Sequence, residues 1–135
     1  MTATAPAGPV TLILPPVATM VRVGRLTASS IASLADMSID DIDDIKIAVS
    51  EMITLLIQSG SRSTITLRFE TTADAFSVEA STPSEGSNLG RNDLALATAV
   101  LEAVADEHQI ASTDDRILLR IVKHLAAQAS SAASV

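Results

Sequence analysis

Apolar residues recur at helical spacing in three parts of the chain. This spacing predicts helices over residues 17 to about 36, 41–60 and 93–106. In the second of these segments, apolar side chains follow one another three or four residues apart and form one continuous stripe: Ile42, Ile45, Val49, Met52 and Leu56. Ser38, three residues before Asp41, is typical of a helix N-cap. The second segment is therefore predicted to be a helix with one face against a core.

Shorter runs predict strands between and around these helices. Residues 64–69 alternate apolar and polar side chains, which is typical of a half-buried strand. Four further runs are predicted as strands: 10–14, 75–80, 109–112 and 116–122. Residues 81–92 are polar and rich in glycine and serine. A loop of that length inside a compact domain is usually functional or mobile.

The order of these elements predicts the class of fold. Strand, helix, helix, strand, strand, loop, helix, strand, strand is typical of an α+β two-layer sandwich, a mixed, mostly antiparallel sheet with helices on one face. The other face, or the edge of the first strand, would stay open for a partner or a second subunit. We expect a single domain over 10–125, with disordered ends at 1–9 and 126–135, which are rich in small residues.

Composition narrows the function classes. The chain has no cysteine, which excludes disulfides and thiolate sites, and a net charge of -7, which argues against nucleic-acid and anionic-membrane partners. Aromatic residues make up only 1%, so the core is built from aliphatic packing. No apolar run approaches the roughly 20 residues that span a bilayer, and the first residues lack the pattern of a signal peptide. A cytoplasmic protein is expected.

Few residues suggest metal or nucleophile chemistry on their own. His108 and His124 lie on different elements and have no acidic residue at metal-ligand helical spacing, so no metal site is expected. No G-x-S-x-G elbow occurs, and residues 84–87 lack the ending of a P-loop. These observations favour ordinary surface roles for both histidines and for the serine-rich loop.

The second helix carries two charged features. Glu51 falls outside its apolar stripe, on the same face as Ile47, Leu55 and Gln58, where a glutamate is usually only solvated. Four aspartates occupy its first turns: Asp40, Asp41, Asp43 and Asp44. They complement the helix dipole, and the alternative interpretation is a docking surface for a basic partner.

Residues 43–60, DDIKIAVSEMITLLIQSG, resemble the D-I-K-x-A-V-S-E-x-x-T-N box of the anti-sigma factor/serine protein kinase family. That family belongs to the GHKL, or Bergerat-fold, ATPases, which have a histidine-kinase-like ATPase fold. Residues 24–42 look like the rest of its first two helices, and the later elements follow in the same order. The resemblance thus spans nearly the whole chain, although only the box is specific.

The resemblance implies a catalytic centre that is only partly present. The family's catalytic base falls on Glu51. Its Mg²⁺-binding asparagine falls on Leu55, which offers no oxygen to a hard cation. Its adenine-reading aspartate falls on Ala80, and the glycine of that motif on Thr82. A methyl group cannot accept a hydrogen bond from the adenine amine.

The resemblance also assigns a phosphate-binding position and a partner-binding position. The later Gly-x-Gly, which lets the backbone approach phosphate, falls on Ala95 and Ala97. The arginine on the first helix that contacts the sigma factor falls on Arg25. The nucleotide positions are therefore altered together, whereas the partner-binding position is kept.

The resemblance implies an anti-sigma-factor-like regulator that sequesters a sigma factor and forms a homodimer. Phosphoryl transfer depends on positioned metal and charge, so no enzyme activity, metal or cofactor is expected, and ATP and Mg²⁺ would bind only if the degenerate site still holds them. Two alternatives remain open: an ATP-dependent serine protein kinase acting on an anti-anti-sigma factor, and a dimerising interaction domain with another partner.

Overall fold

The computed structural model describes residues 6–125, which form three helices and five strands. In chain order these are β1 (Val10–Leu14), α1 (Met20–Leu34), α2 (Ile39–Gln58), β2 (Ile65–Thr71), β3 (Ala75–Pro83), α3 (Arg91–Val104), β4 (Glu107–Ser112) and β5 (Arg116–His124). All eight predicted elements are present; β1 has the predicted bounds, and the bounds of the other seven are shifted. The predicted disorder at 1–5 and 126–135 lies outside the described residues.

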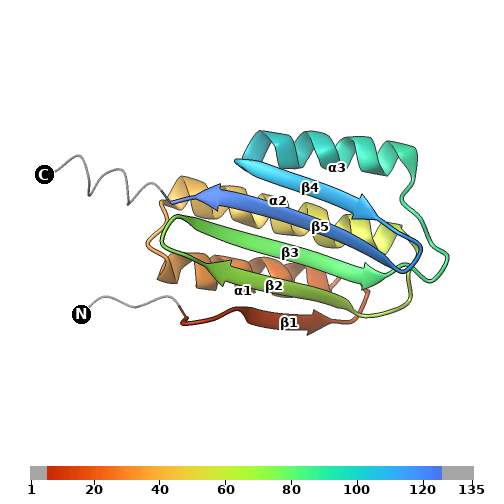
Figure 1. Ribbon diagram of the computed structural model, residues 1–135, viewed down its shortest axis with the longest axis horizontal. Helices are drawn as coiled ribbons and strands as arrows, with labels where there is room; N and C mark the ends of the chain where they lie inside the picture. The colour runs from red at the N-terminus through yellow and green to blue at the C-terminus, as the bar shows by residue number, and fades with distance from the viewer. Residues whose placement is uncertain (1–5, 126–135) are drawn as a thin grey trace, which may run out of the picture.

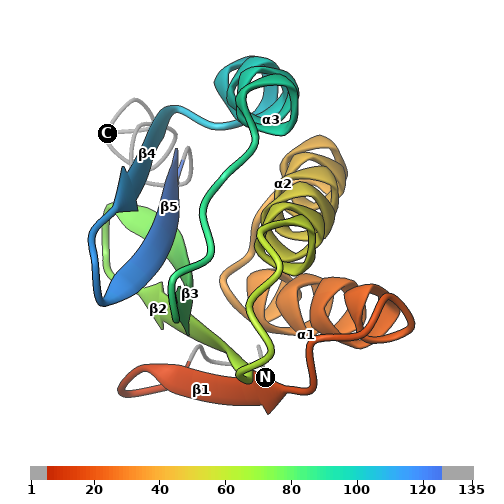
Figure 2. The ribbon, with the colours of Figure 1, turned by 90° about the vertical axis from the view of Figure 1, so that its right-hand side faces the viewer.

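The five strands form one sheet in the order β1-β2-β3-β5-β4, and all three helices lie on one face of it (Figures 1 and 2). The α+β two-layer class is therefore confirmed. Each neighbouring pair of strands is antiparallel, so the prediction of a mixed sheet is wrong. The connection through α3 makes β3 and β4 parallel to each other, but β5 lies between them and is antiparallel to both.

The core lies between the inner face of the sheet and α2, which runs between α1 and α3 (Figure 2). Seven residues of α2 are buried: Ile45, Ala48, Val49, Met52, Ile53, Leu55 and Leu56. This arc is wider than the predicted stripe, because helices flank α2 on both sides. Leu55 was expected on the more exposed face with Glu51, and that prediction is wrong: its exposed fraction is 0%.

Helix α1 depends on packing against α2. Its N-cap, Thr19, makes no capping hydrogen bond, and Gly24 lies inside the helix, where glycine costs about 1 kcal/mol relative to alanine. A Cβ added at Gly24 would lie 2.3 Å from Ile53 Cδ1 on α2. The glycine therefore allows the two helices to approach closely, at the expense of helix propensity.

The N-terminus of α2 is fixed by a cap and by a buried lysine. Ser38 Oγ accepts a hydrogen bond from the Asp41 N–H at 3.1 Å, as predicted. Lys123 extends from the inner face of β5, with its Nζ 2.9 Å from Asp44 Oδ2 and 3.5 Å from Asp41 Oδ1. Two of the four predicted dipole aspartates thus also bind the sheet.

The connection between β3 and α3 is shorter than predicted. Residues 81–83 continue β3, so the expected loop over 81–92 is wrong at both ends and only residues 84–90 connect the two elements. The Ser84 N–H donates to the Asp115 carbonyl at 3.0 Å, and Ser63 Oγ donates to Glu85 Oε1 at 2.5 Å. These contacts attach the connection to the β4–β5 turn and to the segment before β2.

Candidate functional site

The predicted site residues separate into two main locations. Arg25 on α1 and Glu51 on α2 line the same groove between these helices. Leu55, Ala80 and Ala97 lie instead in the hydrophobic core. The structure therefore brings the predicted partner-binding residue and the predicted catalytic base together, and separates both from the predicted nucleotide positions.

The groove between α1 and α2 has a volume of about 870 Å³. Its lining comes from three residues of α1 and five of α2: Arg22, Arg25, Leu26, Asp43, Lys46, Ile47, Ser50 and Glu51. Leu26 is 54% exposed and Ile47 is 48% exposed, so the groove offers apolar surface to a partner. Helical spacing brings these residues to one side, because each helix repeats its face every three or four residues.

Charges surround this apolar surface. Lys46 Nζ lies 3.4 Å from Asp43 Oδ1, an exposed pair that contributes little to stability. Arg22 and Arg25 have no ion-pair partner among the described residues. Two arginines beside exposed aliphatic side chains can bind a segment that carries both carboxylates and apolar groups.

Leu55, Ala80 and Ala97 are each fully buried. Ala80 lies in the middle of the sheet, in register with Leu67 on β2 and Leu119 on β5. Leu55 and Ala97 belong to the same core, which continues across α2 and α3. A nucleotide placed against these positions would have to displace packed aliphatic side chains.

The two remaining predicted positions, Thr82 and Ala95, also lack the features of a nucleotide site. Thr82 is buried, and its hydroxyl lies 3.1 Å from Ser61 Oγ and 3.1 Å from the Thr64 carbonyl oxygen. Ala95 is exposed on α3, two residues from the buried Ala97. Alternate positions on a helix point in different directions, so the pair cannot present one flat surface to a ligand.

Within residues 6–125, no group of three or more acidic or histidine side chains could hold a metal ion. His124 Nε2 lies 2.9 Å from Glu107 Oε2, which is a surface interaction. Across the same residues, no helix combines the length and the apolar character needed to cross a bilayer.

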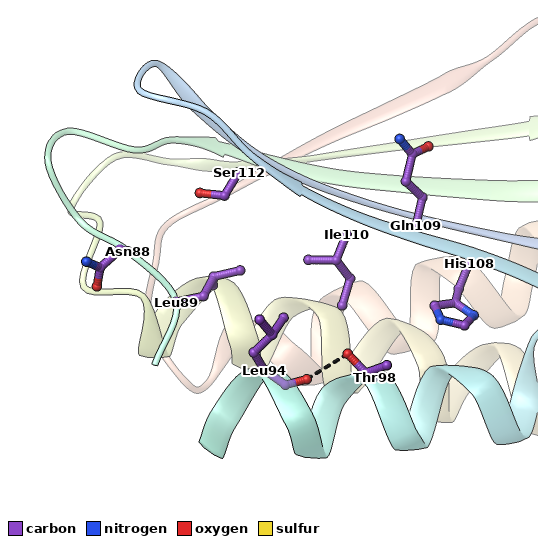
Figure 3. Close-up of a pocket in the computed structure, with 8 residues that line it drawn as sticks. All are labelled: Asn88, Leu89, Leu94, Thr98, His108, Gln109, Ile110 and Ser112. Atoms are coloured by element: carbon purple, nitrogen blue, oxygen red, sulfur yellow. Dashed lines mark hydrogen bonds between the residues drawn. The ribbon is translucent and has the colours of Figure 1, made fainter. Parts of the chain in front are cut away.

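Sequence reasoning missed a second hollow, of about 510 Å³, between α3, β4 and the connection before α3. Figure 3 shows Ile110 and His108 pointing from β4 toward Leu94 and Thr98 of α3, with Gln109 pointing away. No pattern in the sequence indicates that β4 ends up at the sheet edge below α3. The nearest signal was the polar segment before α3.

The comparisons with known proteins give a structural likeness. No family model and no curated protein matches the chain. Its structure is similar to that of the RsbU and RsbW domains of Rv1364c from Mycobacterium tuberculosis, with a TM-score of 0.71 and 20% sequence identity over 90% of this chain. This chain spans 33% of the length of that one. At this identity the likeness shows a shared fold, and it agrees with the fold expected from the sequence resemblance.

Proposed function

We propose that this domain is an anti-sigma-factor-like regulator that sequesters a sigma factor in the cytoplasm through the groove between α1 and α2. The observation that carries the proposal is the position of Arg25 in that groove, beside the exposed side chains of Leu26 and Ile47. Such a surface combines a charged anchor with apolar area, as protein-binding sites commonly do.

Two comparisons point to the same class of regulator. The box at residues 43–60 resembles anti-sigma factors, and the fold is similar to a structure that contains an RsbW domain. The box lies on α2, which supplies one wall of the groove. The segment with the specific resemblance therefore contributes directly to the proposed binding surface.

The proposal treats the nucleotide site as lost. The position that would bind Mg²⁺ is a buried leucine, and the adenine and phosphate positions at Ala80 and Ala97 are packed into the same core. Phosphoryl transfer depends on positioned metal and charge stabilisation. The alternative of a serine protein kinase for an anti-anti-sigma factor thus lacks support, and Glu51 would contribute to the groove and not to catalysis.

A binding experiment with a purified sigma factor from the same cell tests the partner. We expect Arg25→Glu to weaken binding at least about tenfold, since it replaces a cation by an anion within the surface. Arg62→Glu is the matched control, because Arg62 is exposed in the segment between α2 and β2. An equal loss of affinity in both variants would indicate a general charge effect. Failure of the unaltered protein to bind any sigma factor would contradict the proposal.

A fluorescent ATP analogue tests the nucleotide site. The chain has no tryptophan or tyrosine, so the label supplies the signal. We expect no saturable binding with or without Mg²⁺, because the core leaves no space at Leu55 and Ala97. Saturable micromolar binding that requires Mg²⁺ would favour the kinase instead.

A further inference from the structure

Strand β4 is an uncovered edge of the sheet. Among the described strands it pairs with β5 alone and is the last strand of the sheet (Figure 1). In an antiparallel pair, alternate backbone N–H and C=O groups of an edge strand point away from its neighbour. β4 therefore presents a row of backbone donors and acceptors along its six residues, a ready template for another extended chain.

The second hollow lies directly beside this edge. It is bounded on one side by α3 and on the other by the helix-facing side chains of β4, His108, Ile110 and Ser112 (Figure 3). A strand added next to β4 would direct every second side chain toward α3 and into this hollow. Main-chain hydrogen bonds would supply affinity, and the hollow would select the alternate side chains.

The lining of the hollow restricts those side chains. Leu89, Leu94 and Ile110 provide its apolar surface, and none of the lining residues is Asp, Glu, Lys or Arg. A charged side chain would lose hydration there without meeting a side chain of opposite charge from Asp, Glu, Lys or Arg, which is unfavourable. The inward positions of an added strand should therefore be apolar and uncharged.

Acidic residues stand at both ends of β4. Asp106 and Glu107 lie at its start, and Asp114 and Asp115 form the turn after it. A second copy of β4 would bring one acidic end against another in either orientation, and like charges directly opposite are unfavourable. An extended segment with basic residues at its ends fits this charge pattern, since each end would meet carboxylates.

We infer that the edge of β4 binds an extended segment of a partner protein, with apolar residues at alternate positions and basic residues at both ends. The segment adds a sixth strand to the sheet beside the existing five, and its inward side chains fill the hollow under α3. This surface is separate from the groove between α1 and α2, so it goes beyond the proposed sigma-factor site.

A labelled peptide of alternating valine and threonine, with lysines at both ends, tests the inference by fluorescence anisotropy on the full chain. We expect saturable binding, about tenfold weaker affinity when alternate peptide amides are N-methylated, and similar weakening when glutamates replace the lysines. N-methylation removes the strand hydrogen bonds but keeps the side chains. Equal affinity for the N-methylated peptide would overturn strand addition, because the hollow would then be binding apolar groups alone.

Variants locate the site. Ile110→Lys should weaken binding about tenfold, whereas Leu96→Lys, at a 62% exposed position of α3 that does not line the hollow, should leave it unchanged. In case Ile110→Lys disturbs folding, Asp114→Lys with Asp115→Lys reverses only the charge of the turn. This variant should favour a peptide with glutamate at one end and lysine at the other over the peptide with lysines at both ends. Absence of saturable binding, no change of peptide preference, or a change of oligomeric mass in Ile110→Lys would each overturn the inference.

Discussion

At the scale of single residues, Leu55 shows how one side chain determines what a helix can do. Its side chain is fully enclosed by the core, where the family that the sequence resembles has a polar metal ligand. The leucine makes α2 a fully packed central helix with buried side chains toward both neighbouring helices. Leu55 therefore contributes apolar burial to the fold, at a position where an oxygen ligand would have to be buried in the core.

We predict that Leu55→Asn restores no nucleotide binding and lowers the free energy of unfolding by about 3 kcal/mol, because an amide would be buried without hydrogen-bond partners. Urea unfolding followed by circular dichroism measures the loss. Leu55→Met keeps the volume and should cost less than about 1.5 kcal/mol. A stable Leu55→Asn protein that bound the ATP analogue with Mg²⁺ would show that the site is altered at one position only.

At the scale of elements, Lys123 links β5 to the start of α2. Burial alone would lower the pKa of Lys123, but the hydrogen bond that Lys123 donates to Asp44 and the negative charges of Asp44 and Asp41 outweigh it, so its pKa lies above the usual 10.5. The charged form is therefore stabilised by folding. The contribution to stability is fully present below about pH 10.5 and is lost as pH rises through the higher pKa of the folded state.

We predict that Lys123→Met lowers the free energy of unfolding by about 1–2 kcal/mol at neutral pH, because Asp44 loses a charged hydrogen bond while keeping some contact with water. The difference between the variant and the unaltered protein should shrink above pH 10.5. Lys46→Met is the control, since its partner Asp43 is exposed and its loss should cost little. The chain has no tyrosine or cysteine, whose side chains would also titrate at alkaline pH. A difference in the free energy of unfolding that stayed constant with pH would therefore contradict this role of Lys123.

The elements themselves were largely predictable from the sequence, and their contacts were not. Local spacing was enough for α2 and its Ser38 cap, because both depend on residues close in the chain. Leu55 is buried in a core to which α3 also contributes, and the extension of β3 through Thr82 depends on its pairing with β5. The groove at Arg25 and the hollow at Ile110 likewise form between elements that are placed by tertiary packing.

At the scale of the whole molecule, the helices leave the opposite face of the sheet without a covering layer (Figure 2). One row across this face is uncharged, with Ile13, Thr66, Ser81 and Leu118 in register on four strands. The next row alternates charge, with Arg68, Glu79 and Arg120 in register. Ile13 is 62% exposed at the end of its row. An uncharged row beside a row of alternating charges is suited to contact with a second copy, in which opposite charges of the two copies can face each other.

We predict that the chain forms a homodimer through this face, with a sedimentation mass twice that of the 14.0 kDa chain. Ile13→Lys should shift the equilibrium toward the monomer at least about tenfold, because each copy would place a charge in the contact. Leu96→Lys, which is equally exposed but lies on the helical side, should leave the mass unchanged. A monomeric unaltered protein, or a dimer that tolerates Ile13→Lys but not Leu96→Lys, would exclude the sheet face as the interface.

In the dimer, the groove between α1 and α2 would face outward on each copy, because it lies on the opposite side of the molecule from the shared sheets. Each copy could then bind its own partner, and a titration by sedimentation should find one partner per chain.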